Sequence, residues 1–224
     1  MQRTWPRHLG IVVAVGTAVL IAACGSSETG ATKPKSTQAT GTGDEVTSLL
    51  AGIPQHGNTL GDPSAPVTVE YFGDLECPFC RQFTLGKLPS LIQSYVRGGR
   101  LKIEYYSLET ATREPEVFKT QQIAALAAGK QNKMWDFLEL FYHEQGEEGS
   151  GYVTEGYLQG LAQQIPGLNL IAWTVARNDP ELASRITSDA QAAAEAGLTR
   201  TPSFLVGESR RTPYAATIKK LLND

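Results

Sequence analysis

Two cysteines separated by two residues lie where a predicted strand gives way to a predicted helix. Residues 67–72 are apolar and β-branched, and the motif Cys77-Pro78-Phe79-Cys80 follows shortly after them. Pro78 suits the first position of a helix, where its missing N–H is not needed. The unpaired N–H groups and partial positive charge of a helix start stabilise a thiolate. We therefore predict a nucleophilic Cys77 that can close a disulfide with Cys80 one turn later.

The N-terminal segment predicts export from the cytoplasm. Arg3 and Arg7 precede an apolar stretch of 15 residues at 9–23, which is too short for a membrane-spanning helix. It ends in Ile-Ala-Ala before Cys24 and resembles the bacterial lipoprotein signal, in which lipid is attached to the cysteine sulfur. We expect residues 1–23 to be a lipoprotein signal peptide and Cys24 to be lipidated. The alternative is an ordinary secretory signal that is cleaved nearby.

A polar segment follows the predicted lipidation site. Residues 24–46 are rich in Ser, Thr and Gly and are expected to form a flexible linker. Such a linker of about 20 residues reaches about 25 Å. Either signal places the mature protein outside the cytoplasm, where disulfides persist. The lipid would anchor it to the bacterial cell membrane without a spanning helix.

Two other uses of the paired cysteines have to be weighed. A structural zinc site needs two further ligands, and once Cys24 and His8 are assigned to the signal region only His56 and His143 remain. These two histidines lack ligand spacing, so we expect no metal site. A purely structural disulfide is also possible, but closing so short a loop removes little chain entropy. Redox exchange is the favoured chemistry.

Residues 47–224 are expected to form one α/β domain. Predicted strands at 67–72 and 101–108 enclose a helix that runs from Pro78 to about residue 97, an order typical of a parallel strand pair. Pro89 is expected to kink or break this helix.

The remaining elements are predicted from periodicity and from their capping residues. A short extended segment is expected at 53–60, a strand at 203–206, and helices at 117–128, 134–142, 154–164, 168–177, 180–196 and 213–222. Only residues 207–211 separate the strand at 203–206 from the last helix, so a final strand in this interval should be stunted. The net charge of −3 and the pI of about 5.7 do not indicate nucleic-acid binding.

Taken in order, four motifs make the chain resemble DsbA-type thiol–disulfide oxidoreductases of the thioredoxin superfamily. They are GDPSAP at 61–66, FGD at 72–74 with the cysteine motif, MWDF at 134–137 and TPSF at 201–204. The resemblance runs from about residue 52 to the C-terminus. It implies a thioredoxin fold with a helical insertion, at about 115–197, between the two halves of the sheet.

The resemblance also implies roles for the reacting residues. Cys77 would be the exposed nucleophile that forms a mixed disulfide, and Cys80 the buried resolving thiol. Glu70 would occupy the place of the buried acid beneath the site and move the proton of Cys80. The spacing from Glu70 to Cys77 is one residue longer than in thioredoxin, and the alternative is a solvated glutamate at a strand edge.

The remaining implied site residues would contact the substrate. Pro202 would be a cis-proline that faces the active site, and Thr201 would offer its backbone to an extended substrate peptide. Pro78 and Phe79, between the cysteines, would lie beside the bound chain.

The residue pair between the cysteines departs from that of the strong oxidants, which carry Pro-His. Phe79 cannot donate a hydrogen bond to the thiolate as a histidine can, and Asp74 and Glu76 oppose a nearby anion. Arg81 offsets them in part. We therefore expect the pKa of Cys77 to be lowered, but less than in the strongest oxidants, with a correspondingly less oxidising potential.

The resulting hypothesis is an enzyme that forms disulfides in reduced secreted or envelope proteins. A monomer is the default expectation, and exchange through the two cysteines needs no metal or organic cofactor. The resemblance implies a membrane partner, such as a quinone-linked oxidase, that reoxidises the cysteines. One alternative is a reductase of the same fold. Another is a binding lipoprotein whose cysteines are an inert staple. An isomerase is disfavoured, because residues 25–46 are too short and polar for a dimerisation domain.

Overall fold

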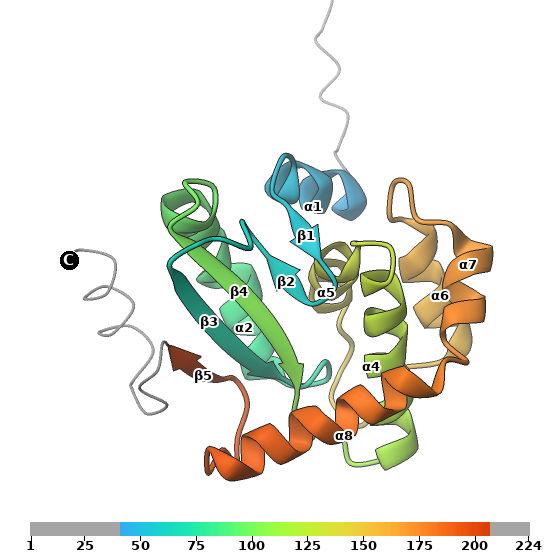
Figure 1. Cartoon of the computed structure of the whole chain (residues 1–224). Helices are drawn as coiled ribbons and strands as arrows, with labels where there is room; N and C mark the ends of the chain where they lie inside the picture. Colours follow the sequence, from blue (N-terminus) through green and yellow to red (C-terminus); the bar gives the residue numbers. More distant parts are fainter. Residues whose placement is uncertain (1–40, 207–224) are drawn as a thin grey trace, which may run out of the picture. The chain divides into compact units, whose positions relative to one another are not determined.

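The two strongest predicted strands form the centre of the sheet (Figure 1). In the computed structural model, which describes residues 41–206, β3 (Val67–Gly73) and β4 (Leu101–Ser107) pair in parallel over their whole length. The other strands are short and pair antiparallel, so the sheet is mixed, with the order β1-β2-β4-β3-β5. They are β1 (Gln55–His56), β2 (Thr59–Leu60) and β5 (Ser203–Val206).

The connection between β3 and β4 is helical but broken, as predicted for Pro89. It consists of α2 (Pro78–Gly86), α3 (Leu88–Leu91) and the π-helical segment η1 (Ile92–Val96). The break falls just before Pro89, because a proline cannot donate to the preceding turn and its ring clashes with the carbonyl there. Gly99, with φ at +67°, ends the connection in the left-handed conformation that glycine adopts readily.

A helix that was not predicted precedes the sheet. Helix α1 (Thr42–Leu50) begins within the expected linker, and its buried residues Val46 and Leu50 belong to the main core. The predicted boundary at residue 46 is therefore wrong. Two apolar residues one turn apart are enough to dock this short helix against α5, and acidic residues in its first turn suit its N-terminal dipole.

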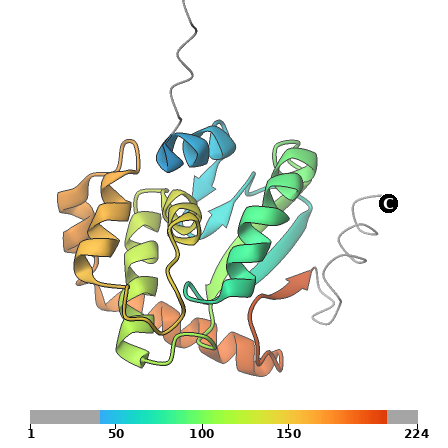
Figure 2. The ribbon, with the colours of Figure 1, turned by 180° about the vertical axis from the view of Figure 1, so that it is seen from behind.

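Five helices lie between β4 and β5, as expected for the insertion. They are α4 (Pro115–Gly129), α5 (Met134–His143), α6 (Glu155–Gln163), α7 (Leu170–Ala176) and α8 (Pro180–Glu195). Helix α2 lies on one face of the sheet, where α5 packs against it, as Figure 2 shows from behind. The long α8 crosses at the other side, where Ala193 packs with Phe72 and Leu205.

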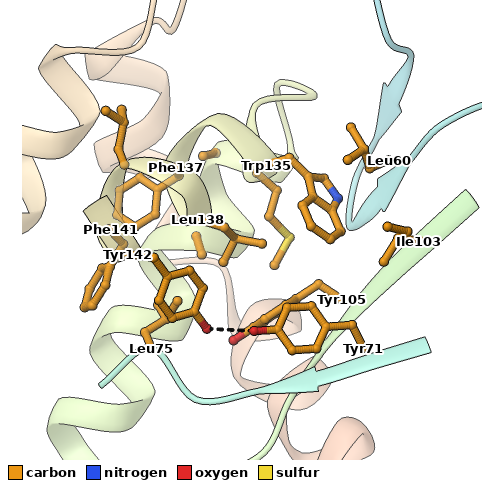
Figure 3. Packing of buried hydrophobic residues seen from close by; sticks show 14 of the residues in the cluster. Leu60, Tyr71, Leu75, Ile103, Tyr105, Trp135, Phe137, Leu138, Phe141 and Tyr142 are labelled. Carbon is orange, nitrogen blue, oxygen red and sulfur yellow. Dashed lines mark hydrogen bonds between the residues drawn. The ribbon is translucent and has the colours of Figure 1, made fainter. Parts of the chain in front are cut away.

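Helix α5 joins the insertion to the sheet. Trp135 points toward Leu60 and Ile103 of the sheet, and its indole N–H donates to the carbonyl of Asn58 at 3.0 Å (Figure 3). Tyr142, two turns later, points toward the residues of β3. This packing fixes the position of α5 and of the core directly beneath the start of α2.

Several predicted features lie outside the described residues. These are the signal segment at 1–23, Cys24, most of the linker and the last helix at 213–222. Among residues 41–206, none of the helices combines the length and the apolar character needed to cross a membrane.

Candidate active site

Cys77 caps the N-terminus of α2, as its sequence context predicts. Its backbone is extended, with φ −69° and ψ 119°, and Pro78 occupies the first helical turn. The N–H of Cys80 donates to Cys77 Sγ at 3.4 Å. The sulfur thus takes the place that a serine or aspartate oxygen takes at other helix starts.

The pKa of Cys77 is lowered from its ordinary value of 9.0 to about 6. The largest cause is a hydrogen bond from the side chain of Cys80, and further hydrogen bonds come from Thr201 and from the backbone N–H groups of Cys80 and Phe79. Burial of the sulfur raises the pKa, but by less than these hydrogen bonds lower it. At neutral pH the sulfur is therefore largely a thiolate, as expected for a usable nucleophile and leaving group.

Cys80 has the opposite character. It is completely buried, and burial, followed by the influence of Cys77, raises the pKa of its thiol well above 9.0. Both cysteines are free thiols in this structure. The pair is therefore unequal, with one sulfur that ionises readily and one that is held as a neutral thiol.

The prediction of an exposed nucleophile is wrong for this conformation. Cys77 is only 3% exposed. Its Sγ lies 3.5 Å from the carbonyl oxygen of Thr201, and the side-chain amide of Gln145 donates to the Cys77 carbonyl at 3.2 Å. The neighbouring Phe79, in contrast, is 66% exposed, so an apolar ring projects into solvent beside the buried sulfur.

Asp74 is a site residue whose role the sequence did not reveal. Its carboxylate is completely buried and accepts five hydrogen bonds. The donors are the N–H groups of Glu76, Thr110, Ala111 and Thr112 and the hydroxyl of Thr112, at 2.6 to 3.1 Å. The negative charge expected to oppose the thiolate instead anchors the loop after β4 to the cysteine motif.

The same loop reaches the segment before β5. The hydroxyl of Thr110 lies 2.5 Å from that of Thr201, and the peptide bond between Thr201 and Pro202 is cis. The structure therefore brings Thr201, Pro202 and the two cysteines together, as the resemblance implied. Residues far apart in sequence meet around one sulfur.

Glu70 does not lie beneath Cys80. Successive side chains of a strand point to opposite faces, and it is Tyr71 whose ring packs on Phe83 of α2. Glu70 faces the other side, where burial raises the pKa of Tyr106 and nearby negative charges, including that of Glu70, add to the effect. The prediction for Glu70 is therefore wrong. The additional residue before Cys77 places a tyrosine where the acid was expected.

The other charged neighbours act less directly than expected. Glu76 is buried, accepts from the N–H of Gly149 at 3.4 Å, and has a pKa raised mainly by burial. The guanidinium of Arg81 donates to the carbonyl of Tyr142 at 2.8 Å. Within the described ranges, none of the clusters of His, Cys, Asp and Glu side chains could hold a metal ion.

An ionisable cysteine at a helix start, a buried partner one turn later and a cis-proline segment against the sulfur define a thiol–disulfide exchange site on a thioredoxin fold. The sequence model of the thioredoxin family matches residues 55–224. The chain belongs to the thioredoxin family, and within it is a DsbA-like thiol–disulfide oxidoreductase.

Individual relatives agree with this assignment. The chain is 24% identical over 172 residues to a probable disulfide bond formation protein D of Bacillus anthracis, covering 74% of this chain and 76% of that one. It is 25% identical to disulfide bond formation protein D of Bacillus subtilis, covering 66% and 67%. Oxidised BdbD from Bacillus subtilis shares the fold, with a TM-score of 0.65 at 23% identity over 77% and 98% of the two chains.

The titration of Cys77 tests the electrostatics of the site. We expect the thiolate absorbance of the reduced protein to rise with a midpoint near pH 6 and to be absent in Cys77→Ser. Because folding lowers the pKa of Cys77, ionisation of this thiol adds to the free energy of unfolding of the dithiol form. The contribution is complete above pH 9.0 and is lost as pH falls through about 6. At pH 7 it amounts to about 1.4 kcal/mol. A midpoint near 9.0 would contradict the account.

Replacement of Asp74 tests the anchor between the loops. Asp74→Asn puts a donating amide among five donors, so we expect the free energy of unfolding to fall by roughly 1–3 kcal/mol in chemical denaturation. Asp62→Asn is the matched control, because Asp62 is exposed and accepts from the N–H and hydroxyl of its near neighbour Ser64. This control should change stability little. Equal effects of the two substitutions would contradict the anchoring role.

Proposed function

We propose that this protein is an extracytoplasmic oxidant that forms disulfides in secreted or envelope proteins. The observation that carries the proposal is the unequal cysteine pair, in which the pKa of Cys77 is lowered to about 6 and that of Cys80 is raised. A stable Cys77 thiolate favours the dithiol form of the enzyme over its disulfide. An enzyme that holds its dithiol form stable tends to take electrons from its substrates.

The proposed reaction begins with the enzyme in its disulfide form. A substrate thiolate attacks Cys77 Sγ, the bond between Cys77 and Cys80 breaks, and a mixed disulfide forms. A second thiolate of the substrate then attacks the first substrate sulfur and releases Cys77 as a thiolate. The substrate loses two electrons and the enzyme gains them. The contact of Cys77 Sγ with the cis-proline segment at Thr201, where the substrate would lie, supports attack at Cys77.

The surroundings of Cys77 suit an unfolded polypeptide as the substrate. The exposed ring of Phe79 offers apolar surface beside the sulfur. The cis-proline segment at Thr201 and Pro202 would lie alongside an extended chain, as the family resemblance implies. The names of the Bacillus relatives, which are disulfide bond formation proteins, support the oxidising direction.

We further propose that the protein works at the membrane. The Ile-Ala-Ala sequence before Cys24 supports attachment of lipid to that cysteine. A membrane redox partner, such as a quinone-linked oxidase, would reoxidise the two cysteines after each cycle. No metal or organic cofactor takes part in the proposed reaction, because both electrons pass through sulfur.

Oxidation of a reduced, unfolded model protein tests the direction of exchange. The oxidised full chain should accelerate disulfide formation, and Cys77→Ser should abolish the acceleration because it removes the attacked sulfur. Reduced Cys80→Ser, mixed with the disulfide form of the same model protein, should instead trap a mixed disulfide with Cys77 that is visible on a non-reducing gel. The Cys77 thiolate displaces one sulfur of the substrate disulfide, and no Cys80 thiol is present to resolve the product.

Two other outcomes would contradict the proposal. If only the reduced form reacts, by reducing disulfides of the model protein, the protein is a reductase. If neither form exchanges, the cysteines are a structural staple and the binding-protein alternative applies.

Fractionation of bacterial cells tests the anchor. The wild-type protein should sediment with membranes, and Cys24→Ser should move most of it to the soluble fraction, because the lipid is the only anchor proposed. Cys77→Ser is the control and should stay with the membranes. Membrane association of Cys24→Ser equal to that of the wild type would contradict lipidation at this cysteine.

A further inference from the structure

Three buried tyrosines converge beneath the active site. Tyr71 of β3, Tyr105 of β4 and Tyr142 of α5 are almost completely inaccessible to solvent, and Figure 3 shows them pointing toward one another. The rings of Tyr71 and Tyr105 lie 5.4 Å apart and perpendicular. The hydroxyls of Tyr71 and Tyr142 are joined by a hydrogen bond of 3.4 Å.

The three hydroxyls differ in how firmly their partners hold them. Tyr142 donates to the carbonyl of Asp74 at 3.2 Å, and Tyr105 exchanges hydrogen bonds with the side-chain amide of Gln122. Tyr71 has only the hydroxyl of Tyr142 and that of Thr84, each at the long distance of 3.4 Å. The bond that Tyr105 donates to Gln122 is equally long, at 3.4 Å, but its acceptor is an amide oxygen, which accepts more strongly than the hydroxyl oxygens beside Tyr71. The Tyr71 proton is therefore the easiest of the three to redirect.

Tyr71 is also the tyrosine that lies against the helix carrying Cys80. Its hydroxyl is 3.4 Å from that of Thr84, which stands one turn after Cys80 on the same face of α2, and its ring packs on Phe83. Burial raises the pKa of the Cys80 thiol, and a hydrogen bond from the side chain of Tyr71 works against this rise. The phenol itself stays neutral, because burial raises its own pKa well above 10.0. It can therefore donate a hydrogen bond to a Cys80 thiolate without giving up its proton.

We propose that the hydroxyl of Tyr71 is the hydrogen-bond donor to the sulfur of Cys80 when that sulfur leaves the active-site disulfide. The attacking thiolate forms a bond to Cys77 Sγ, the bond between Cys77 and Cys80 breaks, and the electron pair stays on Cys80. The Tyr71 proton turns from its long bond with Tyr142 to this anion, until a proton from solvent neutralises the thiolate.

This role replaces the one expected of a buried acid. A carboxyl group would exchange its proton with Cys80, so the rate of exchange would also depend on pH through the ionisation of that carboxyl group. A neutral phenol holds the leaving sulfur by a hydrogen bond alone. The inference rests on the exchange step of the proposed function but not on its direction, because the same bond between Cys77 and Cys80 breaks or forms either way.

The test uses the oxidised full chain and reduced glutathione, a monothiol that isolates the first attack. Tyr71→Phe removes only the hydroxyl and should lower the second-order rate constant by roughly tenfold, since a hydrogen bond to a charged group is lost. Tyr105→Phe is the matched control, because it removes an equally buried hydroxyl that bonds to Gln122, and its rate should stay within about twofold of the wild type. Samples quenched with acid and weighed by mass spectrometry report the glutathione adduct.

Three results would overturn the inference. One is a Tyr71→Phe rate within twofold of the wild type, and another is an equal slowing by Tyr105→Phe. The third needs no variant: the wild-type rate should follow pH only through the thiolate fraction of glutathione, so a second titrating group would indicate a buried acid. A wild-type protein that forms no adduct at all would instead refute the exchange chemistry of the proposed function.

Discussion

The rest of the site depends on the sulfur of Cys77 standing at the first turn of α2. There it receives hydrogen bonds from the thiol of Cys80 and from backbone N–H groups, and these outweigh the burial that opposes its charge. The arrangement is local, because a cysteine, a proline and a helix start supply it. The tertiary fold adds the residues that surround and bury the two cysteines. Burial makes Cys80 a poor anion, so the two sulfurs of one disulfide have different fates when it opens.

The residues that bury the site come from segments that are distant in the sequence. The carboxylate of Asp74 fixes the loop at 110–112, and Thr110 in turn contacts Thr201 beside the cis-proline. Helix α5 of the insertion supplies Tyr142, which closes the space beneath β3. The insertion therefore helps to build the floor of the site. A buried charge with five donors is also costly to disturb, which ties the geometry of the site to the stability of the fold.

Much of this could be read from local patterns in the sequence. The parallel pair of β3 and β4, the break at Pro89 and the five insertion helices follow from apolar periodicity and from capping residues, which depend on near neighbours only. The errors have a different origin. Helix α1 is short and lies in a polar region, so its docking on α5 is decided by tertiary contacts. Glu70 was misplaced because a shift of one residue turns a strand side chain to the opposite face. The donors around Asp74 come mostly from residues more than thirty positions away.

The reduction potential of the couple formed by Cys77 and Cys80 tests the central claim most directly. It can be measured on the full chain by equilibration in glutathione buffers of graded composition. The stabilised Cys77 thiolate predicts a value closer to about −120 mV, that of a strong oxidant of this fold, than to about −270 mV, that of thioredoxin. A value near or below the thioredoxin potential would contradict the claim that the site is built to accept electrons.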